Sequence, residues 1–221
     1  MITKEKLIFF KMNILAIESS SKKLIVGLYI DNDVQKLSSS KINDTANALP
    51  LLTKQILKNS SLKHTDLDAV CISTGPGSFT SLRVGMSYAK GLSMSLDIPI
   101  IPISTFESLI HNFTDDNIHI LIYSHGKTFY LCNYKRKDNV LMQKSKPSTV
   151  TINDVLKLKE KIIYNGPDNY FNELKMSNLN IELVDLNIDN LVEIAISNFK
   201  LLKTKSLDNL VPNYVGNFEI K

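Results

Sequence analysis

The chain has 221 residues and a mass of 24.9 kDa, is 43% hydrophobic, and carries 26 Lys and Arg against 22 Asp and Glu, a formal net charge of +4. This composition supports a buried core and excludes global disorder. Two isolated cysteines, Cys71 and Cys132, exclude a disulfide-rich scaffold and a cysteine-based zinc module.

The charge pattern gives little indication of a partner. Lysines are spread along the whole chain, which predicts at most a weak affinity for polyanions despite an isoelectric point near 8.9. No apolar run approaches the ~20 residues of a membrane-spanning helix, so we expect a cytoplasmic protein with no membrane contact. Met12 directly precedes the first convincing strand, and residues 1–11 are therefore interpreted as an N-terminal extension.

The first half of the chain predicts three strands followed by alternating helices and strands. Short apolar runs bounded by turn residues indicate the strands, and apolar residues at helical spacing indicate the helices. The expected strands are 13–18, 24–30, 34–38, 68–74 and 98–103. The expected helices are one that begins at Asp44 or Asn47 and ends near Lys58, and those over 78–96 and 105–113.

The second half predicts nearly the same order. Its expected strands are 118–123, 128–134, 140–143, 161–164 and 181–184, and its expected helices are 153–158, 168–174 and 189–202. In both halves the fourth strand ends in a Gly-Pro turn that opens a helix, at Gly75-Pro76 and Gly166-Pro167. The repetition predicts duplicated βββαβαβα units, an α/β fold with two ribonuclease-H-like subdomains arranged as in actin, divided into 12–113 and 114–221.

Two segments of the first half are candidates for a nucleotide site. In the predicted fold the first hairpin faces the cleft between the subdomains, where hydroxyls and a carboxylate suit a phosphate or a metal-bound water. The first Gly-Pro turn offers a helix N-terminus to an anion. Both segments are also explained as ordinary turns, and neither has the lysine of a P-loop. The candidates are Glu18, Ser19, Ser20, Gly75, Gly77 and Ser78.

Other chemistry finds little support in the sequence. The second hairpin, 123–127, has no carboxylate, which argues against efficient phosphoryl transfer. The histidines at positions 64, 111, 119 and 125 form no His-x-x-x-His motif, and Cys71 lies within a predicted core strand. We therefore expect no cofactor, no metal and no catalytic residue.

The helix over 78–96 carries small residues every four positions: Ser81, Gly85, Ala89 and Ser93. Glycine inside a helix costs up to about 1 kcal/mol, so a closely packed partner is expected. That partner is either the chain's own helix over 47–58 or a second protein, and the stripe alone leaves both open.

Two segments resemble the TsaB (YeaZ-type) family, and the second is the more specific. They are Ile14-Leu-Ala-Ile-Glu-Ser-Ser20 and Ser73-Thr-Gly-Pro-Gly-Ser-Phe-Thr-Ser-Leu-Arg-Val-Gly85. Weaker echoes are Lys90-Gly-Leu92, Ile103-Ser-Thr105, Asn165-Gly-Pro167 and Pro212-Asn-Tyr-Val215, so the resemblance extends from Met12 to about Val215.

The resemblance implies a non-catalytic scaffold subunit of the bacterial machinery that forms N6-threonylcarbamoyladenosine at position 37 of tRNAs reading A-starting codons. It implies pairing with the catalytic subunit TsaD through the first two helices, recruitment of the ATPase TsaE, and contact with tRNA only through the complex. The candidate partner residues are Leu49, Leu52, Ser81, Arg83, Gly85, Ala89 and Ser93. The same stripe can pair two copies of the free protein as a homodimer.

Some positions depart from the family pattern. Members usually carry Gly at Ser81, His near Asn43-Asp44-Thr45, an Asp-Ala-Arg-like run at Tyr123–His125, and Arg at Gly216. The second half is the more eroded, which weakens any nucleotide or tRNA contact there. Two other interpretations stay open: an actin-fold ATPase or small-molecule kinase acting alone through Glu18 and the first Gly-Pro turn, and, more remotely, a metallopeptidase.

Overall fold

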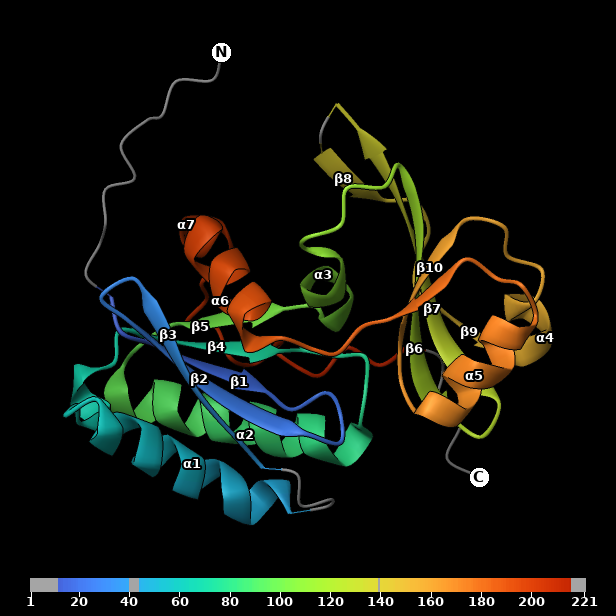
Figure 1. The fold of residues 1–221 in the computed structure, drawn as a ribbon. Helices are drawn as coiled ribbons and strands as arrows, with labels where there is room; N and C mark the ends of the chain where they lie inside the picture. Colours follow the sequence, from blue (N-terminus) through green and yellow to red (C-terminus); the bar gives the residue numbers. More distant parts are fainter. Residues whose placement is uncertain (1–11, 40–43, 139, 216–221) are drawn as a thin grey trace.

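The computed structural model describes residues 12–39, 44–138 and 140–215, and shows two five-stranded paths of the same topology side by side (Figure 1). The predicted extension 1–11, Asn43 and Gly216 lie outside the described residues. The first sheet contains β1 (Ile14–Glu18), β2 (Leu24–Ile30), β3 (Asp33–Ser39), β4 (Ala69–Ser73) and β5 (Ile100–Ile103). The second contains β6 (Asn117–His125), β7 (Thr128–Lys137), β8 (Val140–Gln143), β9 (Ser148–Thr151), β10 (Lys161–Asn165) and β11 (Ile181–Leu183).

Strand order confirms the predicted duplication. The first sheet has the order β3-β2-β1-β4-β5 and the second the order β8-β7-β6-β10-β11. In the first sheet β1 lies between the antiparallel β2 and the parallel β4, and in the second β6 lies between the antiparallel β7 and the parallel β10. All five residues of β1 are buried, as expected for a central strand covered on both faces. Strand β9, which pairs with β7 outside this path, was not predicted from the sequence.

The helices lie on both faces of each sheet (Figure 1). They are α1 (Thr45–Asn59), α2 (Phe79–Leu96), α3 (Thr105–Ile110), α4 (Ile152–Val155), α5 (Asp168–Met176), α6 (Ile188–Ser197) and α7 (Phe199–Leu202), with a 3-10 turn over His64–Asp66. Helices α1 and α2 cover one face of the first sheet, and α4 and α5 cover the outer face of the second. The single helix expected over 189–202 is interrupted at Asn198, which ends α6 and precedes α7.

Helix α3 of the first half and helix α6 of the second half each pack against the sheet of the other half. Phe106 and Leu109 of α3 join the core of the second sheet, whereas Leu191 and Val192 of α6 join the core of the first. A division of the chain between residues 113 and 114 separates the strands of the two sheets, but each core contains a helix from the other side of that division. The two halves are therefore interlocked through their hydrophobic cores.

Candidate functional site

The structure brings together the two segments predicted to bind a nucleotide. The backbone N–H of Ser78 donates to the carbonyl of Ser20 at 2.6 Å, and a side chain on Gly77 would overlap that same carbonyl. Gly75 has φ +99, a backbone conformation that favours glycine. The N-terminal amide of Ser78 is thus occupied by the chain's own backbone and is not presented to an anion.

Glu18 lies beneath this contact and is 1% exposed. Its Oε1 accepts hydrogen bonds from the Ser20 N–H at 2.7 Å, the Ser20 hydroxyl at 2.6 Å and the Ser73 hydroxyl at 2.9 Å. Burial raises the pKa of the Glu18 carboxyl, and the bonds from Ser20 and Ser73 oppose that shift without cancelling it. The carboxyl is buried and its Oε1 ties the first hairpin to β4, while its Oε2 has no hydrogen-bond partner among the described residues. The predicted contact of Glu18 with a cation through water stays a prediction.

Ser19 completes the first candidate segment and is 1% exposed. A side chain on Gly85 would overlap Ser19 Oγ and would lie 3.5 Å from Cδ1 of Ile72. Gly85 therefore allows α2 to approach the ends of β1 and β4 of its own sheet. The close partner predicted from the small-residue stripe is, at this position, the sheet rather than a second helix.

Burial separates the seven residues predicted to contact a partner. Leu49, Gly85, Ala89 and Ser93 are buried inside the chain, and the Ser93 hydroxyl donates to the carbonyl of Ile98. Because these four residues are buried, they cannot form the exposed partner surface that was predicted for them. The helical spacing of small residues is the same whether the stripe faces the sheet or the solvent, so the sequence did not show which way it faces. The other three remain predicted contacts: Leu52 and Ser81 are half-buried and Arg83 is exposed.

Two positions that depart from the family pattern contact each other. The hydroxyls of Thr45 and Ser78 donate to Ser81 Oγ at 3.2 Å and 3.1 Å. Ser81 consequently links the beginning of α1 to the beginning of α2. A glycine at position 81 would leave both donors without this acceptor.

The second Gly-Pro turn is closed by aromatic rings. A side chain on Gly166 would overlap the hydroxyl of Tyr164 and would lie 2.5 Å from Cβ of Tyr123. Tyr123 stacks on Tyr170 with ring centroids 5.2 Å apart. Burial is the largest cause of the raised pKa of the Tyr164 hydroxyl. At Gly166 this turn therefore has no room for a larger side chain.

A C-terminal segment that the site prediction omitted covers the first turn. The Asn213 N–H donates to the carbonyl of Thr74 at 2.6 Å. The Arg83 guanidinium lies 3.7 Å from the centroid of the Phe79 ring, and its Nε donates to the Tyr214 hydroxyl at 3.0 Å. The Pro212-Asn-Tyr-Val215 echo was the sequence signal for this segment, but its target is visible only in the fold.

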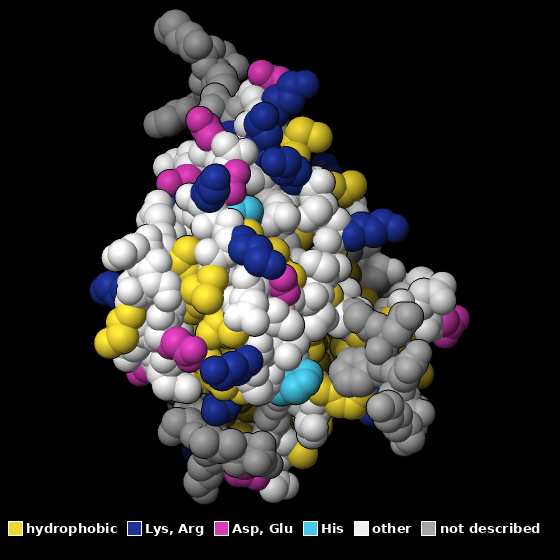
Figure 2. Space-filling model, turned by 90° about the vertical axis from the view of Figure 1, so that its right-hand side faces the viewer, with side chains coloured by type: hydrophobic (Ala, Val, Ile, Leu, Met, Phe, Trp, Pro, Cys, Tyr) yellow, Lys and Arg dark blue, Asp and Glu magenta, His cyan; other side chains and the backbone are white. Residues whose placement is uncertain are grey.

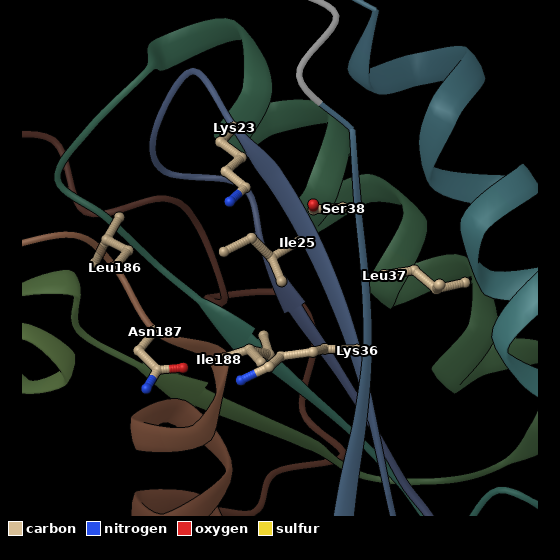
Figure 3. A pocket seen from close by; sticks show the side chains of 8 residues that line it. All are labelled: Lys23, Ile25, Lys36, Leu37, Ser38, Leu186, Asn187 and Ile188. Atoms are coloured by element: carbon tan, nitrogen blue, oxygen red, sulfur yellow. The ribbon is translucent and has the colours of Figure 1, made fainter.

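A cavity of about 270 Å³ lies between the first sheet and the beginning of α6 (Figure 3). Lys23 and Lys36 reach it from the first hairpin and β3, and Asn187 and Ile188 approach from α6. Lys36 is already paired with Asp189 at 2.8 Å. None of the six residues predicted to bind a nucleotide lines this cavity.

No group of three or more His, Cys, Asp or Glu side chains in the described residues is arranged to hold a metal ion. Among the helices of the same residues, none combines the length and apolar character needed to cross a membrane.

The duplicated sheets and interlocked helices define the class of the protein as actin-like, within the group related to TsaD. The model of the family described as "TsaD: tRNA N6-adenosine threonylcarbamoyltransferase" matches residues 43–206. The chain is 32% identical over 165 residues to the tRNA threonylcarbamoyladenosine biosynthesis protein TsaB of Bacillus subtilis, which covers 71% of this chain and 72% of the relative. The chain belongs to the TsaB family.

A second relative and a solved structure are also similar to this chain. TsaB of Buchnera aphidicola from Acyrthosiphon pisum is 35% identical over 131 residues, which covers 57% of this chain and 59% of the relative. The structure titled "YeaZ from Pseudomonas aeruginosa" superposes with a TM-score of 0.73 at 14% identity, covering 92% of this chain and all of that one. That superposition shows the same fold.

Proposed function

We propose that this chain is a non-catalytic scaffold of the machinery that forms N6-threonylcarbamoyladenosine at position 37 of tRNAs reading A-starting codons. The observation that carries the proposal is the closure of both Gly-Pro turns. The Ser20 carbonyl accepts from the Ser78 amide in one half, and the side chains of Tyr123 and Tyr164 pack against Gly166 in the other. An actin-fold ATPase or kinase would need one of these turns to be open to phosphate.

The proposed role in the complex is to pair with a TsaD-like catalytic subunit in the cytoplasm and to help recruit a TsaE-like ATPase. Four exposed residues of α1 and α2 define an outer face for this pairing: Leu51, Arg83, Gly91 and Met94. Leu51 is 66% exposed and Met94 is 74% exposed, and a side chain on Gly91 would meet no atom within 4 Å. A protein partner on this face would cover the apolar side chains of Leu51 and Met94.

Co-purification with the TsaD homologue of the same genome tests the proposal. Gly91→Arg places a long charged side chain on the outer face without disturbing the core, and we expect it to abolish the complex. Asn172→Arg, on the exposed side of α5, is the matched control and should keep it. Gly85→Arg is unsuitable because it would overlap Ser19 and disrupt the fold. A wild-type pair that does not associate would overturn the scaffold role.

The recruitment of the ATPase and the pairing of free copies are tested with the same proteins. A TsaE homologue should be retained with wild-type chain and TsaD and be lost with Gly91→Arg. If the outer face also pairs two copies, sedimentation of the isolated wild type should show a dimer that Gly91→Arg converts to a monomer. Retention of TsaE by the Gly91→Arg chain would contradict the shared face.

A further inference from the structure

The positive charge of the protein is concentrated in one segment. Residues 134–147 carry five basic side chains and one acidic side chain, a net charge of +4, which equals the net charge of the whole chain. The remaining residues are therefore neutral overall, although lysines occur throughout them. The basic residues are Lys135, Arg136, Lys137, Lys144 and Lys146, and the acidic one is Asp138.

This segment is the β7–β8 ribbon, which extends beyond the rest of the second sheet (Figure 1). Lys135 pairs with Met142, and Arg136 pairs with Leu141. Because side chains alternate between the faces of a strand, Lys135, Lys137 and Met142 share one face, and Arg136 and Leu141 share the other. Lys144 follows Met142 by two residues, and its backbone N–H donates to the carbonyl of Asn133 at 2.7 Å.

The two faces of the ribbon have different roles. Arg136 donates to the backbone carbonyls of Phe113 and Thr114, and Leu141 packs against the core that contains α3. On the opposite face, the three lysines are exposed and Met142 is 53% exposed. We call this opposite face, defined by Lys135, Lys137, Met142 and Lys144, the basic ribbon face. Figure 2 shows several Lys and Arg side chains toward the upper end of the molecule, where β8 lies in Figure 1, with Asp and Glu side chains among them.

The lysines of the basic ribbon face form no ion pair in the described part of the chain. Five lysines elsewhere in the described residues do, among them Lys161 with Glu182 at 2.6 Å and Lys205 with Asp97 at 2.8 Å. Glu160, an acid near the ribbon, is bound by His119 at 2.6 Å. That hydrogen bond is the largest cause of the lowered pKa of the Glu160 carboxyl, and the charge of Lys144 makes the smallest contribution to the shift.

The base of the ribbon is fixed by a hydrogen-bond network. His119 Nδ1 lies 2.6 Å from Asn133 Oδ1, and Asn133 Nδ2 donates to Ser145 Oγ at 3.1 Å. The lysines therefore project from an anchored backbone. Residues two apart on a strand are about 6.8 Å apart, a spacing that lets Lys135 and Lys137 reach neighbouring groups of one extended polyanion.

We propose that the basic ribbon face binds the phosphate backbone of RNA directly. The inference rests on the proposed function, in which the polyanion is a tRNA. The resemblance implies contact with tRNA only through the complex, whereas this inference adds a direct contact between the chain and the RNA. Lysine acts as a point charge toward phosphate, so the contact is independent of sequence. The exposed Met142 adds an apolar surface between the cations.

Salt-dependent binding of a tRNA transcript to the full chain tests the inference. The variant Lys135→Gln/Lys137→Gln/Lys144→Gln should raise the dissociation constant at least tenfold at 0.1 M salt. It should also reduce the slope of log K against log salt by about 2, since each phosphate contact contributes about 0.7 to 0.9. The matched control removes three other exposed lysines that lack ion pairs in the described residues, Lys22, Lys63 and Lys200, and should change the constant less than threefold.

The outcomes separate this inference from the proposed function. Equal loss in both triple variants, or unchanged RNA binding in the ribbon variant, would overturn it. Loss of TsaD co-purification in the ribbon variant with unchanged RNA binding would instead make the face a protein surface and would also overturn it. A wild-type chain that fails to pair with TsaD contradicts the proposed function, whereas an intact complex without ribbon-dependent RNA binding contradicts only the RNA contact.

Discussion

The two Gly-Pro turns occupy the same place in the two halves and are closed by different means. In the first half, Gly77 contacts the backbone carbonyl of Ser20, and the C-terminal segment covers the turn. In the second half, Gly166 contacts the side chains of Tyr123 and Tyr164. Strand order therefore positions the turn, but its neighbours decide whether a ligand can enter. A main-chain contact and a side-chain contact also differ in how well they tolerate substitution.

Gly77→Ala should have the largest effect. Its new methyl group would overlap a backbone carbonyl that cannot rotate away, so we expect the free energy of unfolding to fall by about 3 kcal/mol, the upper range for overpacking. Urea denaturation measures it. Gly91→Ala is the control: in an exposed helix interior with open space it should stabilise the protein by up to about 1 kcal/mol. Equal effects of the two variants would contradict the close contact.

Gly166→Ala should have a smaller effect, about 2 kcal/mol, because part of the obstruction is the far end of a tyrosine side chain. In the background Tyr164→Phe, which removes the overlapping hydroxyl, the same substitution should cost less than it does in the wild type. The difference between the two costs, measured by a double-mutant cycle, isolates that contact. Additive effects would mean that Tyr123, and not Tyr164, limits the space.

The duplication could be read from the sequence because local signals repeat. Buried strands, Gly-Pro turns and helix starts recur in order, and the strand pairing confirms them. The exchange of α3 and α6 between the two cores could not be read, since an apolar helical face does not specify which sheet will cover it. Residues 148–151 were missed as a strand because Ser-Thr-Val-Thr is short and largely polar.

The sequence singled out the two segments of the candidate site but did not predict their geometry, and their binding of a nucleotide stays a prediction. Glu18, Ser20, Gly77 and Ser78 do come together, yet the sequence does not show that Ser20 turns its carbonyl toward Ser78 or that Glu18 points inward. The spacing of Gly85 and Ala89 predicted a close helix, but the neighbour at Gly85 is the chain's own sheet. That spacing could not distinguish a sheet beneath the helix from a partner above it.

The buried carboxyl of the first hairpin predicts a pH dependence, whereas the second hairpin, residues 123–127, has no carboxylate. The pKa of Glu18 is raised in the folded state, so its stabilising contribution is complete below the ordinary carboxyl pKa near 4.5 and is lost as pH rises through the folded value. The difference in unfolding free energy between wild type and Glu18→Gln should therefore decrease with pH in that window.

Urea denaturation at a series of pH values measures this difference, and Glu160→Gln provides a control of opposite sign. The pKa of Glu160 is lowered, so its contribution is present above the ordinary carboxyl value and is lost as pH falls through the folded value. A pH-independent difference between wild type and Glu18→Gln would show that the carboxyl is not held in the interior.

The smallest expected effect concerns the segment that covers only the first turn. Tyr214→Phe removes the hydroxyl that accepts from Arg83 Nε but keeps the ring beside Phe79. Because both side chains are partly exposed to water, we expect a coupling free energy of about 0.5 to 1 kcal/mol in a cycle with Arg83→Met. The same cycle measured on TsaD co-purification shows whether the contact also orients Arg83 on the outer face. A coupling in stability without one in complex formation would confine this contact to closing the turn, whereas coupling in both would make the C-terminal segment a determinant of the partner surface.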